Sequence, residues 1–181
     1  AGLTAGDRLA RAVVLEQDGR PGEWVSLSSP YAWERFEALR AGWGSFVLEG
    51  ERNGTPVEWR LGPGRGGLKV RPAREGDPLG ACWEKVQAAW TAAAEKRWQE
   101  ALSALGDAEA LAGDLAPEVL PGILLERGNL LRKKGDLAGA GEAFARAAAA
   151  CAQKFGESDL WRAECLYRQG AAAWVRRALS A

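Results

Sequence analysis

The sequence predicts an α+β protein of 181 residues, in which a small β-rich module with one helix precedes about five α-helices. Two observations predict this division. Up to residue 79 short apolar segments are separated by turn-forming dipeptides such as Asp18-Gly19 and Asn53-Gly54. From residue 80 onward the sequence is rich in alanine, leucine, glutamate, lysine and arginine, the strongest helix formers. We therefore expect two domains, residues 1–79 and 80–181.

The first domain contains a hairpin and a helix. In "SFVLEGERNGTPVEWRLG" apolar and polar residues alternate on both sides of Asn53-Gly54, a dipeptide that favours a tight turn with positive φ. This pattern predicts antiparallel strands at 45–52 and 55–61. Ser29-Pro30 is typical of a helix start, and Gly42 of a helix end. The glycine-rich "GPGRGGLKV" lacks the Gly-Lys-Ser/Thr ending of a phosphate-binding loop, so we expect a turn and a last strand, "GLKVRP".

The second domain is predicted to be a helical repeat. Its helices are expected to be interrupted at Gly113-Asp114, Gly135-Asp136 and Gly156. A period near 40 residues on helix pairs is typical of a solenoid. Three positions recur at an offset of 39 residues and two at an offset of 42: Ala101/Ala140, Leu105/Phe144 and Ala108/Ala147, then Leu124/Leu166 and Gly128/Gly170.

The unit at 124–147 resembles a tetratricopeptide repeat. That family places a large residue, a glycine and a large residue on the first helix, then alanine, an aromatic and alanine on the second. Small residues let two helices approach closely, and the aromatic ring fills the space beside them. The spacing is similar to the long-helix repeats of kinesin light chains, and the resemblance covers residues 80–181. The matching residues are Leu124, Gly128, Leu131, Ala140, Phe144 and Ala147.

The tetratricopeptide resemblance implies a peptide-binding groove on the first helix of each pair. In family members an asparagine and a basic residue, at places like Asn129 and Lys133, hold a peptide carboxylate through charge-assisted hydrogen bonds. In the alternative interpretation, the tryptophans are inter-repeat core and Arg132-Lys133 is a solvated helix end favoured by the helix dipole. The groove positions are Trp83, Val86, Trp90, Leu125, Asn129, Arg132, Lys133, Tyr167 and Trp174.

The N-terminal "AGLTAGDRL" resembles the turn and first strand of bacterial PDZ domains. The later order of a helix at Ser29-Pro30, a strand and the hairpin at Arg52-Asn53-Gly54 matches that family too. Asp7 is expected to accept backbone hydrogen bonds within the turn. The loop that holds a peptide carboxylate in PDZ domains would precede this motif. We therefore expect either an incomplete module or a substitute strand supplied by "GLKVRPA".

The composition excludes several function classes. Lysine plus arginine equal aspartate plus glutamate at 24 each, so neither nucleic acid nor a membrane surface is an expected partner. The absence of histidine excludes imidazole-based catalysis and histidine-ligated metals within this chain. Three cysteines without a C-x-x-C pair favour a reducing cytoplasm. No cofactor and no metal are expected.

These observations predict a non-catalytic protein-interaction or scaffold module of a larger cytoplasmic bacterial signalling protein. The lack of any methionine at the start also suggests a piece of a longer polypeptide. The alternative is a regulatory fragment of a multidomain enzyme, a caspase-like protease or a kinase, whose catalytic domain lies outside this chain. Catalytic candidates within the chain are limited to the thiols and a carboxylate pair: Cys82, Cys151, Cys165, Glu34 and Glu37.

Self-association is a third hypothesis. The last predicted helix has no second helix to complete its unit, so its apolar residues are expected to seek a partner chain or a further repeat. Those residues are Leu166, Trp174 and Leu179.

Overall fold

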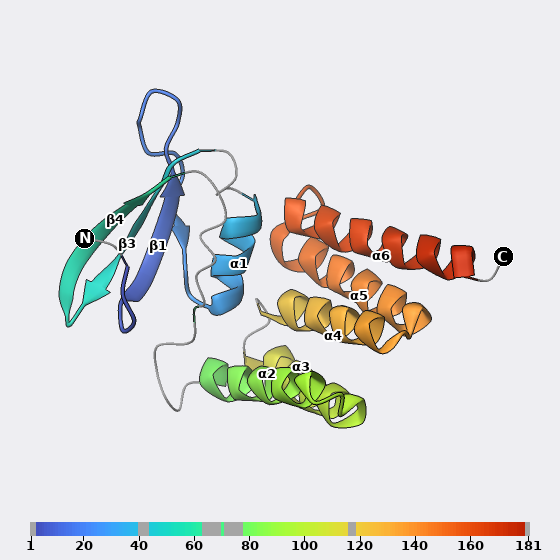
Figure 1. Cartoon of the computed structure of the whole chain (residues 1–181). Helices are drawn as coiled ribbons and strands as arrows, with labels where there is room; N and C mark the ends of the chain where they lie inside the picture. The colour runs from blue at the N-terminus through green and yellow to red at the C-terminus, as the bar shows by residue number, and fades with distance from the viewer. Residues whose placement is uncertain (1–2, 40–43, 63–69, 71–77, 116–118, 180–181) are drawn as a thin grey trace. The chain divides into compact units, whose positions relative to one another are not determined.

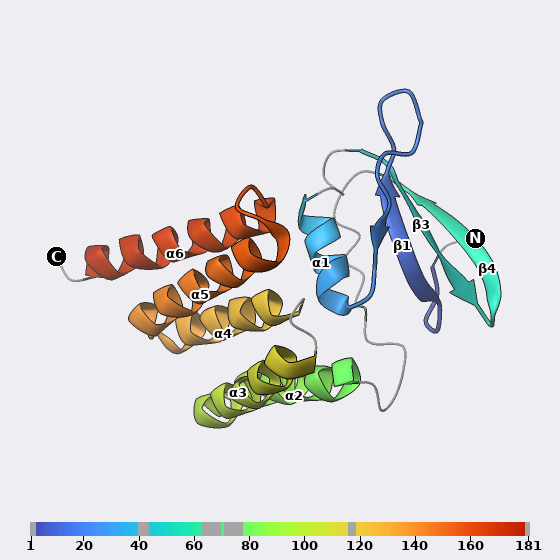
Figure 2. The same ribbon diagram turned by 180° about the vertical axis from the view of Figure 1, so that it is seen from behind.

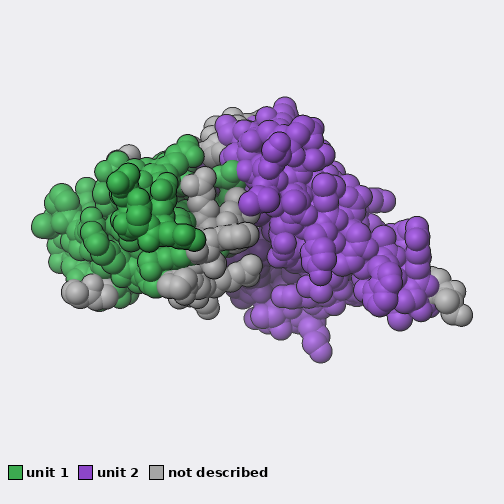
Figure 3. All heavy atoms as spheres, turned by 90° about the horizontal axis from the view of Figure 1, so that it is seen from above, with its two compact units in different colours: residues 1–73 green, residues 74–181 purple. Residues whose placement is uncertain are grey.

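The computed structural model describes residues 3–39, 44–62, 70, 78–115 and 119–179. The chain divides into two compact units, Ala1–Ala73 and Arg74–Ala181 (Figure 3). Among the described residues, the first unit contains a four-stranded antiparallel sheet and one helix, and the second contains five helices (Figure 1). The predicted α+β architecture, with the sheet first and the helices second, is confirmed.

The sheet has the strand order β2-β1-β3-β4, and every neighbouring pair is antiparallel. The predicted hairpin is present, because β3 and β4 pair continuously up to Arg52 opposite Thr55. Asn53 (φ 52°) and Gly54 (φ 79°) form its turn with the positive φ values that the Asn-Gly sequence favours. The strands are β1 (Arg8–Val14), β2 (Val25–Ser26), β3 (Phe46–Arg52) and β4 (Thr55–Leu61).

Helix α1 (Pro30–Leu39) supplies the aromatic half of the first core. The hydroxyl of Ser29 accepts a hydrogen bond from the backbone N–H of Ala32 at 3.1 Å, which caps the predicted helix start. The ring centroids of Trp33 and Phe36 then lie 6.2 and 5.6 Å from that of Phe46 on β3. The predicted strand "GLKVRP" falls outside the described residues except for Val70, which packs against this core.

The five helices of the second unit follow one another as packed neighbours, each against the next (Figure 2). The expected interruptions are present: α3 ends at Leu115, directly after Gly113-Asp114, and Gly135 and Gly156 follow the ends of α4 and α5. The helices are α2 (Pro78–Ala94), α3 (Trp98–Leu115), α4 (Leu120–Lys134), α5 (Leu137–Phe155) and α6 (Leu160–Leu179).

The offset of 39 residues appears in the structure as two equivalent turns. Lys96 ends α2 with φ 60°, and Gly135 ends α4 with φ 93°. In each turn the backbone N–H of the following residue donates to the carbonyl five residues back, at 2.8 Å for Arg97 and 2.9 Å for Asp136. Both turns are therefore left-handed helix caps of the same type. The helix pairs α2–α3 and α4–α5 repeat one backbone plan.

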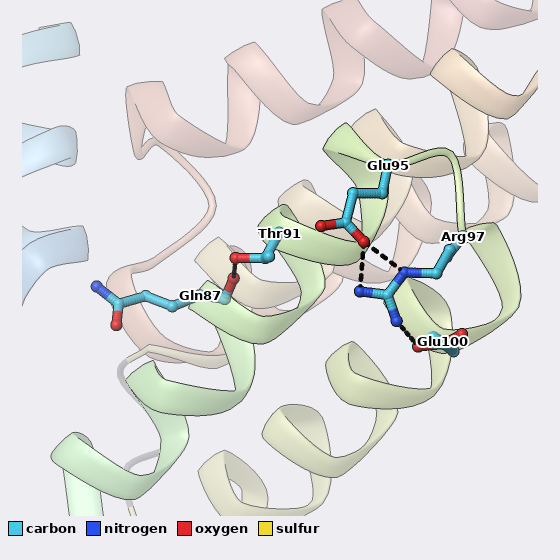
Figure 4. Close-up of polar contacts among 5 residues, drawn as sticks. All are labelled: Gln87, Thr91, Glu95, Arg97 and Glu100. Carbon is cyan, nitrogen blue, oxygen red and sulfur yellow. Dashed lines mark hydrogen bonds and ion pairs between the residues drawn. The ribbon is translucent and has the colours of Figure 1, made fainter.

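Different side chains hold these two turns. In the first, the guanidinium of Arg97 donates to Glu95 at 2.7 Å and also binds Glu100 (Figure 4). In the second, the carboxylate of Asp136 accepts from the backbone N–H of Gly139 at 2.9 Å, which caps α5. Figure 4 also shows the hydroxyl of Thr91 donating to a carbonyl one turn back, that of Gln87, at 3.1 Å. The backbone repeats although the polar side chains do not.

The contact predicted between α4 and α5 is confirmed. Gly128, Ala140 and Phe144 are all buried, and the Phe144 ring lies directly against the Gly128 backbone. The offset of 42 residues also appears in the burial of α4 and α6. The buried pairs at this offset are Val119/Trp161, Ile123/Cys165 and Leu130/Ala172.

Candidate functional site

Polar side chains link α2 to α4 and α4 to α6. The indole N–H of Trp90 on α2 donates to Oε2 of Glu126 on α4 at 3.2 Å. Nη1 of Arg168 on α6 donates to Oδ1 of Asn129 on α4 at 2.9 Å. With Lys133, one turn beyond Asn129 on α4, these residues define what we call the α2–α4–α6 face.

The two links occupy equivalent places in the repeat. Asn129 follows Trp90 by the 39-residue offset, and Arg168 follows Glu126 by the 42-residue offset. Both links therefore join the position held by Trp90 and Asn129 on one helix to the position held by Glu126 and Arg168 on the next helix of the row.

Glu126 is the acidic centre of the α2–α4–α6 face. Burial raises the pKa of its carboxyl, because a charged form is less well solvated there. The Trp90 hydrogen bond and the positive charges of Lys133 and Arg168 oppose part of that rise. One partly buried carboxylate thus faces two cations.

Arg168 fixes the orientation of Asn129. Its Nε donates to Glu164 one turn earlier on α6 at 2.8 Å, so two acceptors hold the guanidinium. Because the Asn129 amide oxygen accepts from Arg168, the amide nitrogen keeps both of its donors. Within the described residues this nitrogen has no acceptor. Asn129 therefore offers donors where the face also carries Lys133.

Three of the sequence-predicted groove residues lie in the interior. Trp83, Val86 and Leu125 are buried among neighbouring helices, where a ligand would have to displace packed side chains to reach them. The Trp83 ring packs edge-to-face against Trp90, with centroids 5.2 Å apart. Trp90 itself remains 37% exposed. The alternative interpretation of the tryptophans as inter-repeat core therefore describes Trp83, whereas Trp90 lies partly at the surface.

The remaining predicted residues are at the surface, in two places. Arg132 and Lys133 are exposed in the last turn of α4, where cations also interact favourably with the helix dipole. Tyr167 and Trp174 on α6 are 73% and 71% exposed. They lie on the side of α6 opposite its buried residues, away from Arg168, and thus outside the α2–α4–α6 face.

Glu126 and Arg168 were missed at the sequence level. The groove positions were transferred one by one from the tetratricopeptide pattern, and neither residue falls on one of them. A signal was available, because the 42-residue offset equates a glutamate with an arginine. In the structure these two opposite charges interact, because the positive charge of Arg168 lowers the pKa of Glu126.

The three cysteines lie in the interior. All three are buried free thiols. Burial raises the pKa of Cys82 to about 11, and its Sγ donates to the carbonyl of Ala108 at 3.5 Å. A hydrogen bond with Cys151 lowers the pKa of Cys165. Glu34 and Glu37 are half-buried on α1. Among the described residues, no group of three or more cysteines and carboxylates is arranged to hold a metal ion.

In the first unit, Asp7 organises the turn before β1. Its carboxylate accepts from the backbone N–H of Thr4 at 2.8 Å, as predicted. It also receives two hydrogen bonds of 2.7 Å from the Arg52 guanidinium at the end of β3. These hydrogen bonds from Arg52 hold the pKa of Asp7 well below its usual range. A shallow hollow of about 330 Å³ beside this pair is lined by Gly6, Arg8, Glu51, Asn53 and Gly54.

No protein-family model, curated protein or solved structure matches the chain. Along the described residues, no helix combines the length and the apolar character needed to cross a membrane.

Proposed function

We propose that this chain is a non-catalytic protein-interaction module, in which a tetratricopeptide-type solenoid follows a PDZ-like module. The α2–α4–α6 face binds a peptide segment and holds a carboxylate of that peptide between Asn129, Lys133 and Arg168. The Arg168–Asn129 hydrogen bond carries this proposal, because it brings a cation to the amide and leaves the amide donors unused.

The chemistry of the face favours an anionic group over a cationic one. Lys133 and Arg168 supply positive charge, and the Asn129 amide supplies neutral donors whose direction Arg168 sets. Charge-assisted hydrogen bonds to a carboxylate are about twice as strong as neutral ones. The hydrogen bond from Trp90 holds the Glu126 carboxylate toward α2. Trp90, partly exposed beside it, offers an apolar surface for a neighbouring peptide side chain.

We place the module in a reducing compartment, the bacterial cytoplasm, as a part of a larger signalling protein. Three buried free thiols support a reducing compartment, because none of them forms a disulfide. The repeated helix pairs support a scaffold role, because each pair adds an equivalent stretch of surface to the row.

Peptide selection tests this function. A display library of random peptides with free C-termini is selected against the chain, and enriched peptides are synthesised with either a free carboxylate or a C-terminal amide. We expect the amide to weaken binding about tenfold or more, as loss of a charge-assisted hydrogen bond predicts. Fluorescence anisotropy of a labelled peptide gives the dissociation constants.

Substitutions locate the site. Lys133→Glu and Asn129→Ala should weaken binding of the carboxylate peptide and leave binding of its amide nearly unchanged. Lys134→Glu is the matched control, because it makes the same charge change at the next exposed position of α4. Equal losses for Lys133→Glu and Lys134→Glu, or no selected peptide at all, would refute the proposed site.

A further inference from the structure

Glu126 of the α2–α4–α6 face is a half-buried carboxylate whose charge is only partly compensated. Its Oε2 accepts from the Trp90 indole, whereas Oε1 has no donor among the described residues. Lys133 and Arg168 lower the pKa of Glu126 through their positive charge, but within the described part of the chain no cation forms an ion pair with it. Burial outweighs these effects and keeps that pKa raised.

Trp90 places an aromatic surface beside this carboxylate. The indole N–H lies in the plane of the ring, so its hydrogen bond holds the Glu126 carboxylate at the ring edge. The ring remains partly exposed although Trp83 packs against it. An aromatic face attracts a cation, and a carboxylate beside it adds a charge-assisted hydrogen bond. Trp90 and Glu126 therefore supply two groups that together recognise a lysine or arginine side chain.

A bound peptide carboxylate makes a cation at Glu126 more favourable. In the proposed function that carboxylate binds Lys133 and Arg168, the two cations that act on Glu126. A second negative charge beside these cations weakens their stabilisation of the Glu126 carboxylate. A positive charge in the same peptide, close to Glu126, offsets this loss. The face therefore favours a peptide with a positive charge on the α2 side of its carboxylate.

We propose that Glu126 and Trp90 form a subsite for a basic side chain, so that the α2–α4–α6 face selects peptides with a lysine or arginine shortly before a free C-terminal carboxylate. This inference rests on the proposed function, because the carboxylate at Lys133 places the peptide. Glu126 precedes Lys133 by seven residues, or about 10 Å along α4. An extended peptide covers about 3.3 Å per residue, so the basic residue falls about three residues before the C-terminal one.

Peptide selection tests the preference without any change to the chain. Among random peptides with free C-termini, we expect enrichment of lysine or arginine about three residues before the C-terminal residue. An enriched peptide is then compared with a version in which norleucine replaces that residue, because norleucine keeps the aliphatic chain and lacks the charge. Fluorescence anisotropy should give a dissociation constant about fivefold or more higher for the norleucine peptide.

Glu126→Gln tests which group recognises this charge. Glutamine keeps an acceptor for the Trp90 indole and removes the negative charge. The variant should bind the basic peptide about fivefold or more weakly than the parent chain does, and it should not weaken binding of the norleucine peptide. Glu84→Gln is the matched control, because it removes a carboxylate at an exposed position of α2.

The outcomes separate this subsite from the proposed carboxylate site. Equal affinities of the basic and norleucine peptides, or equal losses in Glu126→Gln and Glu84→Gln, would overturn the subsite. If C-terminal amidation still weakens binding in that case, the carboxylate site stands without it. If amidation has no effect while the Glu126-dependent preference is present, the carboxylate site fails and the subsite stands. A selection that enriches no peptide would overturn both.

Discussion

The ring of Phe144 lies so close to Gly128 that a Cβ at residue 128 would come within 2.4 Å of the ring atom Cε1. Helices α4 and α5 therefore meet where α4 has no side chain and α5 has a large one. The phenyl ring is fully buried, so the surrounding core leaves it little room to move. This contact sets the spacing of α4 and α5.

Replacement of Gly128 by alanine should destabilise the chain. Alanine improves intrinsic helix propensity by about 1 kcal/mol, but overpacking against a fully buried ring costs about 1–3 kcal/mol beyond that gain. Urea unfolding monitored by circular dichroism measures the difference. Gly141→Ala on α5 is the control, and it should be neutral or stabilising because its Cβ has open space.

A double substitution separates steric conflict from a general weakness of α4. Phe144→Leu alone should destabilise the chain, because it leaves space in the core. Combined with Gly128→Ala, it should cost less than the sum of the two single changes, since the smaller side chain makes room for the new methyl group. Additive losses would show that the ring is not the group that excludes a side chain at position 128.

The helical half was largely predictable because its residues repeat. Ala101, Leu105 and Ala140 fall on buried positions, as the 39-residue offset requires, and hydrophobic periodicity is the signal that such positions leave. The hairpin at Asn53-Gly54 was predictable because its positive φ values restrict the residue types. The end of α3 at Leu115 lies close to the predicted Gly113-Asp114, because glycine disfavours helix and is common at helix ends.

The candidate site was only partly predictable. Asn129 and Lys133 could be transferred from a pattern, but the partner of Asn129 is Arg168 on another helix. Which side chain reaches across depends on how far α6 is displaced along α4, and that displacement is set by packing. Burial likewise separates Trp83 from Trp90, although both are tryptophans on one helix. Sequence periodicity indicates which side of a helix is buried, but not how deeply each residue on that side is buried.

The turn at Lys96 should accept glycine with a gain in stability. Lys96 has φ 60°, a left-handed conformation that costs a residue with a side chain about 1 kcal/mol. The equivalent residue at the end of α4 is Gly135, which adopts this conformation without that cost. We expect Lys96→Gly to raise the free energy of unfolding by about 0.5–1 kcal/mol. The reciprocal Gly135→Ala should lower it by about 1 kcal/mol. Thermal and urea unfolding of both variants measure these changes, and opposite signs are the expected signature.

The Asp7–Arg52 pair should make the first unit sensitive to acid. The two hydrogen bonds from Arg52 lower the folded-state pKa of Asp7, and its side chain is only 3% exposed. A lowered pKa stabilises the fold fully above the unfolded value of about 3.9, and the contribution is lost as pH falls toward the folded value. Urea unfolding between pH 3 and pH 7 should therefore show stability decreasing below about pH 4–5.

Asp7→Asn removes the titrating group and should flatten this pH dependence while lowering stability at neutral pH. Asp18→Asn is the control, because Asp18 and Arg20 form a 3.2 Å pair at the surface and exposed pairs contribute little. If both variants show the acid-dependent loss of the parent chain, other carboxyl groups cause that loss.

The three thiols should react slowly in the folded chain. At pH 8 the pKa of Cys82, about 11, leaves so little thiolate that reaction is roughly 100-fold or more slower than for a free cysteine, before burial is considered. Cys165 should react before Cys82, because its hydrogen bond with Cys151 lowers the pKa of Cys165 whereas burial raises the pKa of Cys82. Alkylation followed by peptide mass spectrometry gives each rate, and unfolding in urea should bring the three rates together. A thiol that reacts in the folded chain as fast as in urea would be exposed and nucleophilic, and it would favour the enzyme alternative over an interaction module.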